Sequence, residues 1–142
     1  MKEINPEEAN RVVNEQGEKV KEKDLERLLT KEQKIEDKFR NSDSISSYLD
    51  RAKSMFNLIR DYWSGEYANV PWKTIAAAAG ALLYVLMPLD LIPDFIPIVG
   101  LLDDAAVIAA CLKLVSDDLV AYEKWKLLRN QNMESRDDSS LS

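Results

Sequence analysis

Residues 88–104 of the 142-residue chain read PLDLIPDFIPIVGLLDD, and this stretch decides the fold. Its prolines, Pro88, Pro93 and Pro97, recur every four or five residues. No straight helix continues through such spacing, because each proline removes a backbone donor and restrains the residue before it. Gly100 then permits a turn of the backbone. The stretch is therefore predicted to form a Pro/Asp-rich corner made of one or two short helical turns.

The segments on both sides of this corner are apolar and are predicted to be helices. Residues 71–87 are apolar on nearly every side, and small residues such as Ala76 and Gly80 would let a neighbouring helix approach closely. Residues 101–129 carry apolar side chains at alternating spacings of four and three, which is typical of an amphipathic helix. A helix that is apolar all round lies either at the centre of a bundle or in a membrane.

The remaining segments complete an all-α prediction, a small bundle of four to six helices. An amphipathic helix is expected over residues 44–64, and with the two apolar helices it forms a core spanning residues 42–130. The strongly charged residues 1–41 are expected to form a helical arm that packs loosely on this core, with Gly17 interrupting its first apolar stripe. Polar residues 131–142 read as a flexible tail.

Composition excludes several classes of function. The formal net charge is −6, which argues against a nucleic-acid partner because binding phosphates requires an excess of cationic side chains. The chain has no histidine, the commonest general base and zinc ligand. Its single cysteine, Cys111, fits a reducing compartment and is expected to be a buried, inert thiol.

The apolar helix before the corner raises the alternative of a membrane location. The uncharged run between Lys73 and Asp90 is 16 residues long, shorter than the roughly 18 to 20 that a spanning helix needs. A hairpin over residues 72–112 would also carry four aspartates, at a cost on the order of 10 kcal/mol in the bilayer core. A cytoplasmic protein is therefore expected, with membrane association through this hairpin as the alternative.

The punctuating residues of the corner resemble those of the YkvA-like family, a small bacterial helical domain of unknown function. The resemblance covers about residues 68–115 and rests on Pro88, Asp90, Pro93, Asp94, Pro97, Gly100, Asp103 and Asp104. It implies a short helical domain without an assigned reaction, whose members are often described as membrane-associated.

Four carboxylates at the corner, those of Asp90, Asp94, Asp103 and Asp104, leave three interpretations open. They cap helix starts and accept hydrogen bonds from amides freed near the prolines, which is the favoured interpretation. They bind a divalent cation such as magnesium or calcium. Or they perform acid–base chemistry. Without histidine, a glycine-rich phosphate loop or a nucleophile beside a base, we predict no enzymatic activity and no cofactor.

The leading functional hypothesis is a non-enzymatic helical interaction or adaptor protein in the cytoplasm, with a protein partner or self-association. The alternatives are a membrane-associated protein that inserts the 72–112 hairpin and a divalent-cation-binding protein that uses the aspartate cluster.

Overall fold

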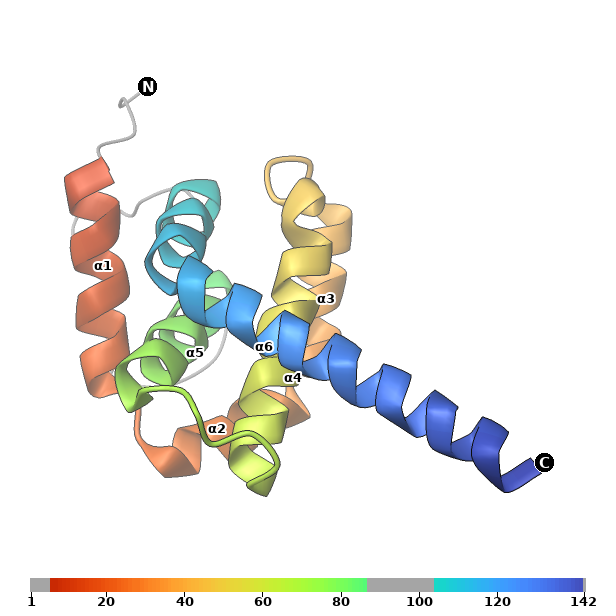
Figure 1. Ribbon diagram of the computed structural model, residues 1–142. Coiled ribbons are helices and arrows are strands. Elements are labelled where there is room, and N and C mark those ends of the chain that lie inside the picture. Colours follow the sequence, from red (N-terminus) through yellow and green to blue (C-terminus); the bar gives the residue numbers. More distant parts are fainter. Residues whose placement is uncertain (1–5, 87–103, 142) are drawn as a thin grey trace.

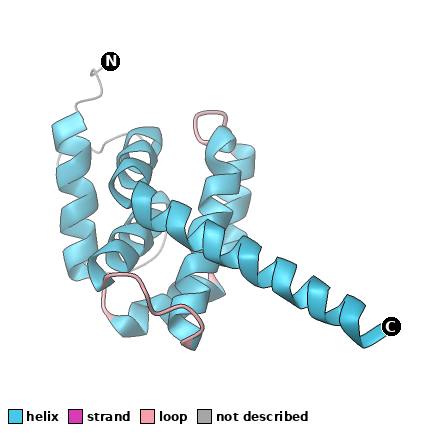
Figure 2. Ribbon diagram, viewed as in Figure 1, coloured by secondary structure: helices cyan, strands magenta, loops and turns pink. Residues whose placement is uncertain are grey.

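The computed structural model describes residues 6–86 and 104–141, with side chains placed as far as residue 132. In this part of the chain the secondary structure is helical and contains no strand (Figures 1 and 2). The elements are α1 (Pro6–Lys19), α2 (Glu22–Thr30), α3 (Glu32–Asn41), a 3-10 turn (Ser46–Tyr48), α4 (Leu49–Ser64), α5 (Trp72–Leu86) and α6 (Asp104–Leu141). The predicted all-α bundle is confirmed.

Helix α5 is the centre of the bundle. Every residue from Thr74 to Leu86 is buried, and the helix contacts each of the other five α-helices. Burial on all sides explains why its sequence is apolar on all sides. Each fully buried leucine or isoleucine in such a core contributes roughly 1.5–3 kcal/mol relative to its exposed state. The central position in a bundle, one of the two readings of this apolar pattern, is the one found here.

Helix α1 packs closely against α5 and α6, which corrects the prediction of a loose arm. Ala9, Val12 and Val13 are at most 1% exposed and belong to the same hydrophobic cluster as α5. Gly17 does not interrupt the helix but lies inside it, where a Cβ atom would come within 3.3 Å of the backbone of Ala76 and Ala77. The stripe is thin because α1 approaches its neighbour through small residues.

The second half of the predicted arm forms two helices, α2 and α3, which are divided at Lys31, whose ψ of 7° departs from helical values. The start of α2 is stabilised by Asp24, whose carboxylate accepts a hydrogen bond from the Lys21 amide at 2.9 Å. The apolar side chains of both helices enter the common core, and the fully buried ones are Leu25, Leu28, Ile35 and Phe39. The packing therefore shows no separation at residue 41, because this core includes residues on both sides of it.

The remaining helices follow the predicted ranges with changes at their ends. Helix α4 begins at Leu49 after the 3-10 turn, and it ends as expected at Gly65, whose φ of 85° is the left-handed conformation that favours glycine. Helix α6 crosses the outside of the bundle and then extends away from it (Figure 1). It continues to Leu141, so the residues predicted as a flexible tail are helical up to that point.

Candidate functional site

The predicted corner lies almost wholly outside the described residues. Of the eight prolines, aspartates and glycine that define the corner, only Asp104 is described. The other seven lie outside the described residues: Pro88, Asp90, Pro93, Asp94, Pro97, Gly100 and Asp103. The structure therefore does not test the expected clustering of the four carboxylates. It does place the two helix ends that the corner joins, Leu86 at the end of α5 and Asp104 at the start of α6.

Both of these helix ends converge on Lys38, a residue of α3. The Lys38 Nζ atom donates a hydrogen bond to the backbone oxygen of Val85, a carbonyl in the last turn of α5. The same ammonium lies 3.8 Å from Oδ2 of Asp104 in the first turn of α6. A cation at a helix C-terminus and an anion at a helix N-terminus both complement the helix dipole. Lys38 therefore ties together the two ends of the segment that the sequence singled out.

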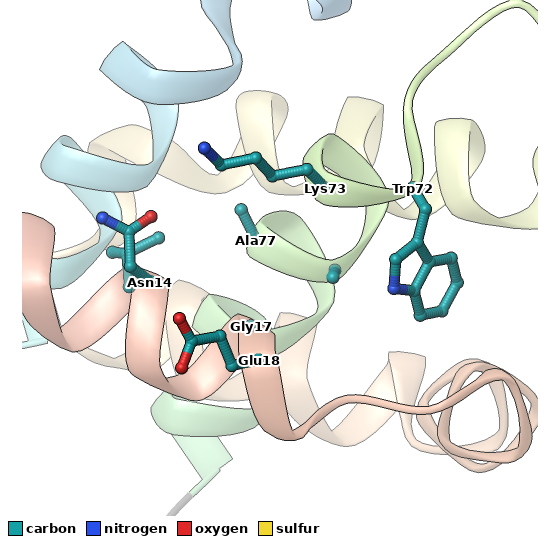
Figure 3. A pocket seen from close by; sticks show the side chains of 8 residues that line it. Asn14, Gly17, Glu18, Trp72, Lys73 and Ala77 are labelled. Atoms are coloured by element: carbon teal, nitrogen blue, oxygen red, sulfur yellow. The ribbon is translucent and has the colours of Figure 1, made fainter.

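A groove of about 430 Å³ lies between α1 and the first turns of α5. In Figure 3 the Lys73 side chain extends above Ala77, while Asn14 and Glu18 project from the opposite helix. Trp72 closes the other end of the groove (Figure 3). The groove thus carries one cationic and one anionic side chain on a floor of small residues.

A second depression, of about 330 Å³, lies where α1 meets the start of α6. Four alanines of α6 line it together with Ala9, Asn10, Tyr48 and Lys113. The alanines are Ala105, Ala106, Ala109 and Ala110. This surface is mainly apolar and lies beside the helix end at Asp104.

A polar and aromatic cluster joins α4 to the middle of α6. Tyr122 donates a hydrogen bond of 2.6 Å to Oδ2 of Asp61, and Lys126 lies 3.5 Å from the same carboxylate oxygen. Tyr67 and Trp125 pack on the Tyr122 ring with centroid distances of 5.1 and 5.9 Å. Burial and the bond to Asp61 raise the pKa of the Tyr122 hydroxyl above its ordinary value. These contacts anchor α6 to the bundle, and the polar groups of Tyr122, Asp61 and Lys126 are paired with one another.

Cys111 is fully buried on the inner side of α6, as expected. Its Sγ atom lies 3.8 Å from Sδ of Met55 and 3.6 Å from the backbone oxygen of Ala77. Burial raises the pKa of the thiol to about 12. Because the thiolate is the nucleophilic form, this environment is that of an inert core residue.

The described parts of the chain hold neither a cluster of metal-ligating side chains nor a membrane-spanning helix. Within residues 6–86 and 104–141, no three residues among histidine, cysteine, aspartate and glutamate gather as a metal-binding group. No described helix combines the length and the apolar character needed to cross a membrane.

Comparison with known proteins places the chain in a family. The family described as "Protein of unknown function (DUF1232)" matches residues 74–110. The uncharacterized membrane protein YkvA of Bacillus subtilis (strain 168) is 42% identical over 74 residues, which cover 52% of this chain and 70% of that protein. The chain belongs to the YkvA-like family. No solved structure matches it.

The family model matches the two helix ends that contact Lys38 but not Lys38 itself. The YkvA-like segment contains most of α5, the predicted corner and the start of α6, up to Ala110. Lys38 lies outside this match, yet it contacts both helix ends within it. No local sequence pattern indicated Lys38, since its contacts depend on how α3 packs against α5.

The outer face of α6 lies beyond residues 74–110, the range that the family model matches. Four large apolar side chains on it are exposed: Leu114 (46%), Val120 (47%), Leu127 (59%) and Leu128 (58%). Ala121, Asp117 and Lys124 lie between them and are also exposed. We call these seven residues the α6 outer face. Single exposed leucines are ordinary, but a group of this kind on one helix is typical of an interaction surface.

Proposed function

We propose that this YkvA-like protein is a non-enzymatic helical interaction module of the cytoplasm, and that it binds its protein partner through the α6 outer face. The exposure of Leu127 and Leu128 carries this proposal, because apolar side chains of this size are stabilised by removal from water. The bundle supplies a rigid base, since Tyr122 and Trp125 anchor α6 just before these leucines.

Site-specific photo-crosslinking in cells tests this proposal. A photoreactive phenylalanine analogue replaces Leu127 in one variant and Arg51, an exposed residue on α4, in a control. We expect a discrete protein adduct from position 127 and none from position 51. The proposal fails if position 127 gives no protein adduct, or if both positions give the same adducts.

The absence of enzymatic activity is part of the same proposal and has its own test. Purified protein is incubated with phosphoester and peptide substrates in the presence of magnesium or manganese, and we expect no turnover. Metal-dependent turnover that Asp94→Asn abolishes would contradict it.

Association with a membrane is a second candidate, favoured by the name of the Bacillus subtilis relative. Because α5 is covered by five other helices, the insertion of a hairpin over residues 72–112 requires the bundle to open. Association through the surface of the folded bundle does not. Fractionation of cells with and without detergent tests this candidate, and protein that stays in the supernatant without detergent contradicts it.

A further inference from the structure

We propose that the α6 outer face pairs with the same face of a second copy of this chain, the two helices running antiparallel about a two-fold axis between Val120 and Ala121. This inference rests on the proposed function, since it names the partner of the same surface. Its basis is the spacing of the exposed side chains and the arrangement of the charges among them.

The apolar residues of the face repeat at the interval that helix pairing requires. Leu114, Ala121 and Leu128 are seven residues apart and form one row, while Val120 and Leu127, also seven apart, form a second row, with Asp117 and Lys124 between the two rows. Seven residues are close to two helical turns, so each row runs along the helix beside the other. Ala121 at the centre is small and permits close approach of the second backbone.

A two-fold axis at this point places apolar residues opposite one another. Leu114 then faces Leu128 of the second copy along one edge of the interface, and Val120 faces Val120 of the second copy along the other edge. Isologous pairing of this kind uses one surface patch twice and closes after two subunits. Because α6 crosses the outside of the bundle and continues away from it, a second helix has room to lie along it (Figure 1).

Charge selects the antiparallel arrangement. Asp117 and Lys124 are exposed, and neither side chain forms a hydrogen bond or ion pair with any described residue. The same axis brings Asp117 opposite Lys124 of the second copy, and this happens twice in each dimer. A parallel pair in register would place Asp117 against Asp117 and Lys124 against Lys124, which is unfavourable. A carboxylate in the middle of the face also disfavours a lipid surface, as does the net charge of −6.

Charge reversal on the full chain tests both the dimer and its register. Sedimentation equilibrium is measured for wild type, Asp117→Lys, Lys124→Asp and the double variant. We expect a wild-type dimer, a dissociation constant raised about tenfold or more in each single variant, and recovery to within about threefold of wild type in the double variant. Lys23→Asp, at an exposed position of α2, serves as the control for net charge and leaves the constant unchanged. Unchanged far-UV circular dichroism shows that the variants are folded.

Three outcomes overturn the inference, and they are distinguishable from failure of the proposed function. A wild-type chain that is monomeric at every concentration excludes the dimer. A double variant as weak as the single variants excludes this register. A monomeric chain that binds vesicles of phosphatidylglycerol and loses this binding in Leu127→Gln assigns the face to a lipid surface. If position 127 crosslinks to a different protein while the chain is monomeric, the interaction module stands and only self-association is wrong.

Discussion

Gly80 of α5 and Gly17 of α1 bring the backbones of their helices into direct contact. A Cβ atom built on Gly80 would lie 2.9 Å from the amide nitrogen of Gly17 and 2.9 Å from the carbonyl carbon of Gln16. A Cβ atom on Gly17 would lie 3.3 Å from the carbonyl oxygen of Ala76. Both neighbours are backbone atoms, so neither moves aside without displacing a helix. The two glycines thus set the distance between α1 and the central helix.

Gly80→Ala is expected to destabilise the protein, because the added methyl group pushes α1 away from α5. Overpacking of this kind costs about 1–3 kcal/mol of folding stability. Replacing glycine by alanine inside a helix gains about 1 kcal/mol. The variant is therefore less stable than wild type only if the overpacking cost lies toward the upper end of its range. We place Gly80→Ala at that end, since the contact is with backbone. Gly17→Ala, with its longer contacts, is expected to lose less. Urea unfolding followed by circular dichroism measures both, and a Gly80→Ala variant at least as stable as wild type would contradict this account.

The same contact shows how much of the fold the sequence predicts. The all-round apolar pattern of α5 indicated a helix at the centre of a bundle or in a membrane, and its small residues indicated a close neighbour. The identity of that neighbour was missed, because Gly17 was interpreted as a break in a charged arm. A glycine inside a helix costs stability locally, and only the tertiary packing of Gly17 against Ala76 and Ala77 explains its presence. Local patterns carry no information about such a long-range contact.

The candidate site divides in the same way. Prolines and aspartates of residues 88–104 mark the corner because backbone chemistry restricts where they occur. Lys38 has no such mark, for it is one of many lysines in a charged segment, and only the packing of α3 beside α5 brings it to Val85 and Asp104. The exposure of the α6 outer face was not predicted from the sequence, for a related reason. Its leucines continue an apolar pattern, and the sequence alone does not tell which of them the bundle leaves uncovered.

Lys38→Met is expected to destabilise the protein by about 1–3 kcal/mol. The change removes a charged hydrogen-bond donor from the Val85 carbonyl and leaves the Asp104 carboxylate without the Lys38 ammonium. Methionine keeps most of the aliphatic volume. The matched control is Lys23→Met, at an exposed position of α2, which is expected to stay within about 0.5 kcal/mol of wild type. Thermal and urea unfolding measure both variants, and equal stabilities would show that Lys38 does not hold the two helix ends.

The buried thiol of Cys111 predicts a loss of stability in alkali. Its pKa is about 12 in the folded protein, against 9.0 for the ordinary thiol, because burial disfavours the thiolate. The thiol is neutral in both states below pH 9, so the stability is fully present there. As the pH rises above 9, ionisation of the thiol in the unfolded state removes stability, and the loss continues up to the folded pKa. Urea midpoints measured from pH 8 to pH 10 should therefore fall more steeply for wild type than for Cys111→Ala.

The same burial is expected to make Cys111 unreactive in the native protein. A thiol-specific reagent such as dithionitrobenzoate should react only when the chain unfolds, so the labelling rate should rise across the urea transition. Rapid labelling in native buffer would show that solvent reaches the thiol. Urea midpoints with the same pH dependence in wild type and Cys111→Ala would show the same.

Divalent cations are expected to leave the protein unchanged, because the Asp104 carboxylate already faces a cation. The Lys38 ammonium lies 3.8 Å from Oδ2 of Asp104, and a second positive charge at the same carboxylate would be repelled. We therefore expect no heat in calorimetric titrations with magnesium, calcium or manganese, and no change in the melting temperature. Melting is a sensitive readout, since a ligand at one hundred times its dissociation constant stabilises the folded state by about 2.7 kcal/mol. A saturable heat of cation binding that Asp94→Asn abolishes would instead establish the aspartates of the corner as a cation site. Lys38 would then be a charge that competes with the cation, and Lys38→Met would tighten cation binding.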